Sequence, residues 1–149
     1  MASQERRKLL NNTGISHDDA RRIIEEGGEE VTPEDLKKVL RQEKKIKRKL
    51  SGPLGKFVDE ARTLFELIRD YWNKRYTEVP WWTIGAAATS LLYILDPMDI
   101  VPDFIPGIGL LDDASVLSVC LFMIRRDLEK YTAWKADEAA VEEVSSDGI

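Results

Sequence analysis

The sequence predicts an all-α protein of about five helices, in which a long amphipathic helix is followed by a helical hairpin with a Pro/Gly/Asp-rich connection. Several segments repeat apolar residues at the i, i+3, i+4, i+7 spacing of a helix, and no segment alternates with a period of two. The chain has 149 residues, of which 43% are hydrophobic. A chain of this length buries roughly 70% of its unfolded surface and suits one domain without disulfides.

The first two predicted helices lie within residues 16–50. Ser16 is expected to cap a short helix that Gly27 and Gly28 end. A second helix begins after Thr32, with proline in its first turn, and is expected to run over residues 33–50. It has one basic face and one apolar face, and the apolar face consists of Leu36, Val39, Leu40, Ile46 and Leu50.

Three longer segments complete the expected fold. Residues 54–76 have one apolar and one charged face, which predicts an amphipathic helix. Residues 79–95 contain no charge and are expected to be helical until Asp96, which precedes a proline. Residues 97–109 hold three prolines and two glycines, so a turn-rich connection is expected there, and helix resumes over residues 112–135.

We expect four regions along the chain. Residues 1–15 form a flexible N-terminus without the hydrophobic run of a secretory signal, and residues 16–50 form the short helix plus the basic amphipathic helix. Residues 51–135 form the main helical domain. Residues 136–149 carry five acids and no base, which predicts an acidic disordered tail.

Charge is distributed unevenly along the chain. The formal net charge is −5, but residues 1–50 carry 13 Lys/Arg against 10 Asp/Glu, and the remainder is strongly acidic. Basic density peaks over residues 37–49, on the amphipathic helix, and such a helix can lie on anionic lipid. The expected lipid-binding cations are Lys44, Lys45, Lys47 and Arg48. Nucleic acid is disfavoured as a partner because no aromatic residue interleaves this basic run.

Few catalytic chemistries fit the composition. Cys120 is the only cysteine and His17 the only histidine, which argues against histidine-based zinc sites and Ser-His or Cys-His catalysis. The chain contains no G-x-S-x-G, H-E-x-x-H, Walker or G-x-G-x-x-G motif. We therefore expect a non-enzymatic protein without a cofactor, and a site built only of carboxylates stays open as an alternative.

Residues 79–124 allow both a membrane hairpin and a soluble bundle. The insertion energies of the two apolar runs come out near zero, partly because Asp112 and Asp113 lie within the second run. Basic residues flank both outer ends of the hairpin, which favours a topology with both ends cytoplasmic. Trp81 and Trp82 are the expected interfacial residues, within a wider aromatic belt of Tyr71, Trp72, Tyr76, Trp81, Trp82, Tyr131 and Trp134. The same residues could instead form the core of a soluble cytoplasmic bundle.

Five aspartates lie within residues 96–113. Oxygen ligands that converge from a turn are what Ca²⁺ or Mg²⁺ requires, so a metal site of Asp99, Asp103, Asp112 and Asp113 is one interpretation. Helix capping explains most of the same residues without metal.

The stretch YILDPMDIVPDFIPGIGLLDD, residues 93–113, resembles the signature of the YkvA family of proteins of unknown function. Its prolines, Gly109 and the aspartates recur at the family's offsets, whereas family members often carry Ser or Asn in place of Asp96. The resemblance covers roughly residues 55–135. It implies a helical module that is frequently assigned to membranes, with a related domain in a RING-type membrane ubiquitin ligase. It implies no activity, substrate or cofactor.

The function we expect is a membrane-associated helical module for interaction or anchoring, with an anionic lipid surface as its partner and a protein partner as a further interpretation. The alternative is a soluble binding module with a divalent-metal site in the Asp-rich loop. The coverage of Ile84, Leu91 and Leu95 is the informative observation, because an exposed apolar face there would favour lipid or a protein partner.

Overall fold

The computed structural model describes residues 17–50, 52–96 and 113–147. Within these ranges the chain is all-helical, which confirms the predicted class, and it has seven α-helices rather than about five. The helices are α2 (His17–Glu30), α3 (Pro33–Arg41), α4 (Glu43–Lys49), α5 (Val58–Trp72), α6 (Trp81–Leu95), α8 (Asp113–Met123) and α9 (Arg125–Asp147), with one 3₁₀ helix, η1 (Gly52–Phe57). The predicted flexible segment 1–15 lies outside the described residues.

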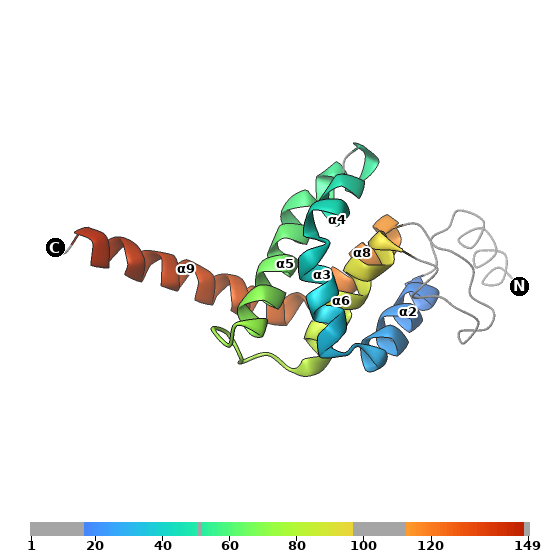
Figure 1. Ribbon diagram of the computed structural model, residues 1–149, viewed down its shortest axis with the longest axis horizontal. Coiled ribbons are helices and arrows are strands. Elements are labelled where there is room, and N and C mark those ends of the chain that lie inside the picture. Colours follow the sequence, from blue (N-terminus) through green and yellow to red (C-terminus); the bar gives the residue numbers. More distant parts are fainter. Residues whose placement is uncertain (1–16, 51, 97–112, 148–149) are drawn as a thin grey trace, which may run out of the picture.

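Helix α6 forms the centre of the bundle. It contacts α2, α3, α4, α5 and α8, which surround it (Figure 1). Every residue from Thr83 to Leu95 is buried, including Ile84 and Leu91, which have no exposed surface. A helix that is apolar on all sides is typical of a protein core, so the uncharged run is explained by burial against neighbouring helices.

Helices α6 and α8 form the predicted hairpin. The Cys120 thiol of α8 donates to the carbonyl of Ala86 at 3.4 Å, and the Thr83 hydroxyl donates at 2.5 Å to the carboxylate of Asp127, which follows α8 in the first turn of α9. These pairs run in opposite directions along the two segments, so the helices are antiparallel and the outer ends of the hairpin lie together. The Asp-rich connection, residues 97–112, lies outside the described residues.

The predicted end of the first helix at Gly27 and Gly28 is wrong, because α2 continues through both glycines to Glu30. The two residues lie where α2 crosses α6. A Cβ added to Gly27 would meet the Thr89 side chain at 2.5 Å, and one on Gly28 would lie 3.4 Å from the Gly85 backbone. The glycines therefore permit a close helix crossing. From the sequence alone, such a pair cannot be distinguished from glycines that end a helix.

Two buried threonines on α6 differ in their hydrogen bonding. Thr83 is bonded to Asp127, whereas the Thr89 hydroxyl has no partner among the described residues. A buried hydroxyl without a partner costs about 1–3 kcal/mol. We expect Thr89→Val to raise the free energy of unfolding by about 1 kcal/mol and Thr83→Val to lower it by about 1–2 kcal/mol. Urea unfolding of both variants tests this, and equal effects would contradict it.

The basic helix predicted over residues 33–50 is present but divided. Thr32 caps α3 with a reciprocal bond to Asp35, as the capping signal indicates. Gln42 leaves the helical conformation, with φ −99° and ψ 15°, although Gln42 N–H still bonds the Lys38 carbonyl at 3.0 Å. Four of the five predicted apolar residues are buried and one is partly buried, so this face packs into the bundle: Leu36, Val39, Ile46, Leu50 and, in part, Leu40.

Helix α5 ends at Trp72, four residues before the predicted end. The Asp70 carbonyl accepts the N–H groups of Arg75 at 2.9 Å and Tyr76 at 3.2 Å, and Lys74 takes a left-handed φ of 62°. This turn closes the helix without a glycine or proline to mark it.

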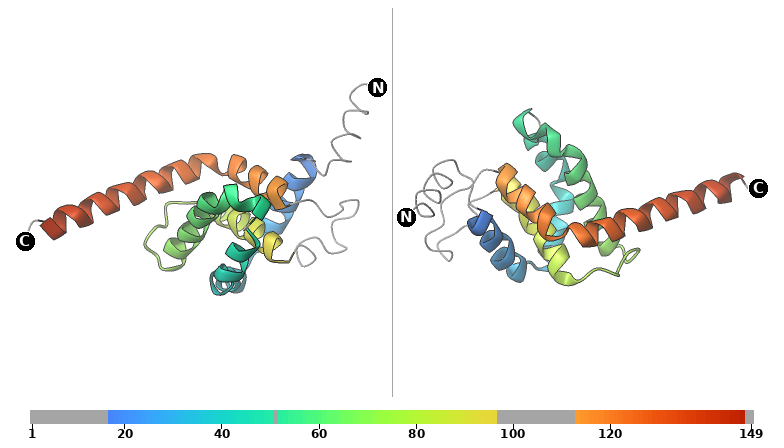
Figure 2. Two further views of the ribbon diagram at one scale, coloured as in Figure 1. Left: turned by 90° about the horizontal axis from the view of Figure 1, so that it is seen from above. Right: turned by 180° about the vertical axis from the view of Figure 1, so that it is seen from behind.

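The predicted tail over residues 136–149 is helical through Asp147, as the distal part of α9, which projects away from the bundle (Figures 1 and 2). The predicted last helix is also divided at Ile124, between α8 and α9. Alanine and glutamate dominate residues 136–143 and both have high helix propensity. The prediction of disorder, which rested on the acidic charge, is wrong for residues 136–147 because the helix propensity of residues 136–143 is high.

Candidate functional site

Three tryptophans are exposed at one end of the bundle. Trp72 ends α5, and Trp81 and Trp82 begin α6. Their exposed fractions are 37%, 38% and 52%, and they are among the few large apolar side chains of the described residues that remain exposed. We call these three residues the tryptophan end.

The turn between α5 and α6 positions these side chains. Residues 73–80 return the chain so that the last turn of α5 lies near the first turn of α6, and the rings of Tyr71 and Trp81 are 6.0 Å apart. Pro80 precedes α6 with an extended φ and ψ, which fixes the direction in which the helix begins.

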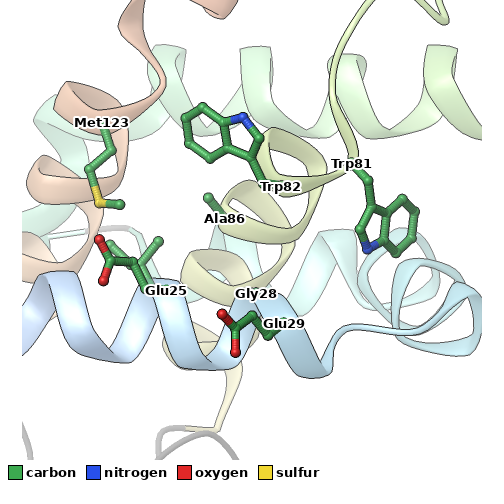
Figure 3. Close-up of a pocket in the computed structure, with 8 residues that line it drawn as sticks. Glu25, Gly28, Glu29, Trp81, Trp82, Ala86 and Met123 are labelled. Atoms are coloured by element: carbon green, nitrogen blue, oxygen red, sulfur yellow. The ribbon is translucent and has the colours of Figure 1, made fainter.

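One hollow of about 260 Å³ opens beside Trp81 and Trp82 (Figure 3). Its remaining lining comes from α2, from Ala86 and from Met123 at the end of α8. The residues of α2 that line it are Ile24, Glu25, Gly28 and Glu29. In the part of the chain that the structure describes, Glu25 and Glu29 form no ion pair. The hollow therefore combines indole rings, an apolar floor and two carboxylates.

A second hollow, of about 540 Å³, is also lined by Trp81 but has a different charge. Tyr71 and Trp72 line it with Pro33, Leu36 and Thr77, and Lys74 is its charged residue. Trp81 thus lines both an acidic hollow and a basic one.

The predicted aromatic belt is divided by the fold. Tyr76, Tyr131 and Trp134 pack together, with ring centroids 5.0 to 5.9 Å apart, and both tyrosines are buried. These three are therefore packing residues that hold α9 against the bundle rather than interfacial residues.

A buried carboxylate secures that packing. Asp70 is 4% exposed and accepts hydrogen bonds from the Tyr131 hydroxyl at 2.6 Å and the Lys135 ammonium at 3.1 Å. The Arg75 guanidinium lies 3.9 Å from its other oxygen. Burial, followed by the nearby Asp70 carboxylate, raises the pKa of Tyr131, so the phenol stays protonated and donates.

The predicted lipid-binding cations lie at the other end of α6. Lys44, Lys45 and Arg48 are exposed on α4, whereas Lys47 pairs with Glu43 at 2.7 Å. Nearby, the Lys49 ammonium donates to the carbonyl of Leu95, the last residue of α6, at 2.6 Å. Fifteen residues of helix rise roughly 20 Å, so the structure does not bring this basic cluster together with Trp81 and Trp82.

The metal interpretation is not tested by the described residues. Asp99, Asp103 and Asp112 lie outside them, and Asp113 is described only as the first backbone position of α8. Within the described ranges, no three His, Cys, Asp or Glu side chains are grouped as metal ligands would be. The soluble metal-binding alternative stays a prediction.

Cys120 is fully buried on α8 beside Ala86. Burial raises the pKa of the thiol to about 12, against a smaller opposing effect of a hydrogen bond with Ser90. At neutral pH the side chain is a protonated thiol that fills space in the core.

The sequence leaves open whether the hairpin over residues 79–124 spans a bilayer, lies on one or forms the core of a soluble bundle. Among the helices that the structure describes, none combines the length and the hydropathy that crossing a membrane requires.

Comparison with known proteins identifies the central hairpin. A family model described as a protein of unknown function, DUF1232, matches residues 83–119, from α6 into α8. Over 80 residues the chain is 35% identical to the "Uncharacterized membrane protein YkvA" of Bacillus subtilis (strain 168), a match that covers 54% of this chain and 76% of that protein. No solved structure is significantly similar. The chain belongs to the YkvA family, which its proline, glycine and aspartate signature already indicated.

Proposed function

We propose that the protein is a non-enzymatic interaction or anchoring module that binds the surface of a membrane through its tryptophan end. The relative from Bacillus subtilis is described as a membrane protein. The observation that carries the proposal is the exposure of Trp72, Trp81 and Trp82 at one end of a bundle whose central helix is covered. Tryptophan favours the lipid interface because its ring is apolar and its N–H can stay hydrated.

The exposed area is sufficient for reversible binding. A tryptophan presents up to ~250 Å², so the exposed fractions leave roughly 100 Å² on each residue, worth about 2.5 kcal/mol at ~25 cal/mol per Å². The three residues together offer at most about 8 kcal/mol. A myristoyl chain binds with an association constant of about 10⁴ M⁻¹, or about 5.5 kcal/mol, and is marginal by itself. The tryptophan end thus supports peripheral, reversible association.

Charges of both signs surround the tryptophan end. Lys74 lies beside Trp81, and Arg125 and Arg126 begin α9 near the first turn of α6. Against these stand the carboxylates of Glu25 and Glu29. Because the charges offset one another, we infer that apolar contact contributes more than attraction to anionic lipid.

The basic helix is the weaker candidate for lipid contact. An interfacial helix must bury an apolar face in the lipid, but the apolar face of α3 and α4 already packs against the core. Only an electrostatic contribution from Lys44, Lys45 and Arg48 is left, and salt screens such a contribution.

Vesicle flotation tests the choice between the two surfaces. We expect Trp72→Ala/Trp82→Ala to lower the partition coefficient at least tenfold on vesicles of phosphatidylethanolamine and phosphatidylglycerol, because roughly 200 Å² of apolar surface is removed. Lys44→Glu/Lys45→Glu should lower it less than threefold at physiological salt.

Phe122→Ala is the control for loss of exposed aromatic area, since Phe122 is 59% exposed on α8. Thermal unfolding confirms that each variant is folded. Binding that is unchanged in the tryptophan variant and lost in the lysine variant would overturn the proposal, as would failure of the unmodified protein to float. Tryptophan-dependent binding to a protein in place of vesicles would do the same.

A further inference from the structure

We propose that the 260 Å³ hollow between α2, α6 and α8 is a binding site for an organic ammonium group. The inference goes beyond membrane association, because it rests on the chemistry of the hollow and holds for a ligand free in solution. It shares Trp81 and Trp82 with the tryptophan end.

The walls of the hollow suit a cation. Trp81 and Trp82 line it, and the face of an indole ring attracts an ammonium group more strongly than other aromatic rings do. In Figure 3, Trp82 and Met123 lie on one side of the opening, with Ala86 at its floor. The thioether of Met123 is polarizable and adapts to the methyl groups of a ligand.

Two carboxylates complete the site. Glu25 and Glu29 are four residues apart on α2, so one helix face presents both at the lip of the hollow (Figure 3). Two like charges at this spacing repel each other weakly, and a bound cation would relieve that repulsion. Neither pairs with a cation of the described residues, whereas the neighbouring Glu26 pairs with Arg22 at 3.7 Å.

Arg125, two residues beyond the lining residue Met123, is engaged elsewhere. The guanidinium of Arg125 lies over the ring of Phe122, 4.3 Å from its centroid, and donates to the Phe122 carbonyl at 3.0 Å. Among the described residues, the lining of the hollow is therefore acidic and aromatic and includes no Lys or Arg.

The volume and the apolar floor of the hollow restrict the class of ligand further. The volume is below the roughly 300–1,000 Å³ typical of pockets for drug-sized ligands, which suits a methylated ammonium of headgroup size. Gly28 and Ala86 leave the floor apolar, so methyl groups on the nitrogen would replace water there. The same group is available from a choline lipid or from a free quaternary amine.

Tetramethylammonium chloride is the probe, followed by tryptophan fluorescence at constant ionic strength with sodium chloride. We expect a saturable change with a dissociation constant in the millimolar range. Neopentyl alcohol, which has a similar shape without charge, should bind at least tenfold more weakly. Glu25→Gln/Glu29→Gln should weaken tetramethylammonium binding at least tenfold.

Glu26→Gln/Glu30→Gln is the matched control, because it removes two charges at the same spacing from the same helix outside the hollow. It should bind as the unmodified protein does. The site is overturned if the two double variants behave alike, or if no saturable change occurs. Far-ultraviolet circular dichroism establishes that both variants are folded.

Vesicles of phosphatidylcholine and of phosphatidylglycerol assign the source of the ammonium group. If a lipid supplies it, Glu25→Gln/Glu29→Gln lowers binding to phosphatidylcholine vesicles as well as to tetramethylammonium, and leaves binding to phosphatidylglycerol vesicles unchanged. If a free amine supplies it, only tetramethylammonium binding falls. Failure of every vesicle experiment with retained tetramethylammonium binding would reject the membrane proposal and support the site.

Discussion

Gly85→Ala is expected to lower the free energy of unfolding by about 2–4 kcal/mol. A Cβ at residue 85 would lie 2.7 Å from the Gly28 carbonyl oxygen and 3.2 Å from the Gly28 Cα. Both are backbone atoms, so no side-chain rotation relieves the contact and α2 must move away from α6. Overpacking of a core typically costs about 1–3 kcal/mol and occasionally more, and a contact between rigid backbone atoms belongs at or above the upper end of that range. The gain of about 1 kcal/mol from alanine in a helix offsets only part of this cost.

Gly28→Ala is the matched control at the same crossing. Its Cβ would lie 3.4 Å from the nearest atom of Gly85, at the edge of ordinary van der Waals contact. The propensity gain should then leave the free energy of unfolding unchanged or raised by up to about 1 kcal/mol. Urea unfolding measures both variants. Equal destabilisation by the two would show that the helices do not cross as described.

Asp70→Ala is expected to lower the free energy of unfolding by about 2–4 kcal/mol. It removes the carboxylate that the Tyr131 hydroxyl and the Lys135 ammonium share, and loss of one partner from a buried pair costs about 3–5 kcal/mol. Lys135 is 41% exposed and regains some hydration, which reduces the expected loss. Asp59→Ala, at an exposed position of the same helix with a 3.8 Å contact to Arg62, should cost less than about 0.5 kcal/mol.

The pH dependence separates this buried bond from simple packing. Because the pKa of Tyr131 is raised in the folded state, the folded protein holds the phenol proton more tightly than the unfolded chain does. In the unfolded chain the pKa of tyrosine is about 10. The free energy of unfolding that this difference contributes is fully present below the pKa of the unfolded tyrosine, and it is lost as the pH rises above that value. Above the pKa of the unfolded tyrosine, the free energy of unfolding of Tyr131→Phe should decrease less with rising pH than that of the unmodified protein. An identical alkaline decline in both would argue against the bond.

Much of the fold follows from local signals that the tertiary structure reinforces. The Thr32 capping box and the Asp96 boundary each mark a helix boundary that the structure confirms, whereas α6 begins at Trp81, two residues after the predicted start. Helix ends without such marks were missed. Gln42 and Ile124 interrupt helices with no proline or glycine, and tertiary contacts determine such breaks.

The candidate site was predictable only in part. Trp81 and Trp82 stand out in the sequence because two adjacent tryptophans lie at the start of an uncharged run. Glu25 and Glu29 did not, since an i, i+4 pair of acids on a short helix is ordinary until α2 is packed against α6. Met123 could not be assigned to the site because nothing in its sequence context distinguishes it from a core residue.

The sequence alone determined the helical class, the hairpin of α6 and α8 and the family, because periodicity, caps and a spaced proline and aspartate signature are local properties. Only the tertiary structure decided which apolar faces are covered. It buried α6 and the apolar face of α3 and α4, and it placed the basic cluster and the tryptophans at opposite ends of α6. The physical reason is that hydrophobicity predicts that a side chain will be buried, but it is non-directional. The fold of the whole chain determines which helix covers that side chain.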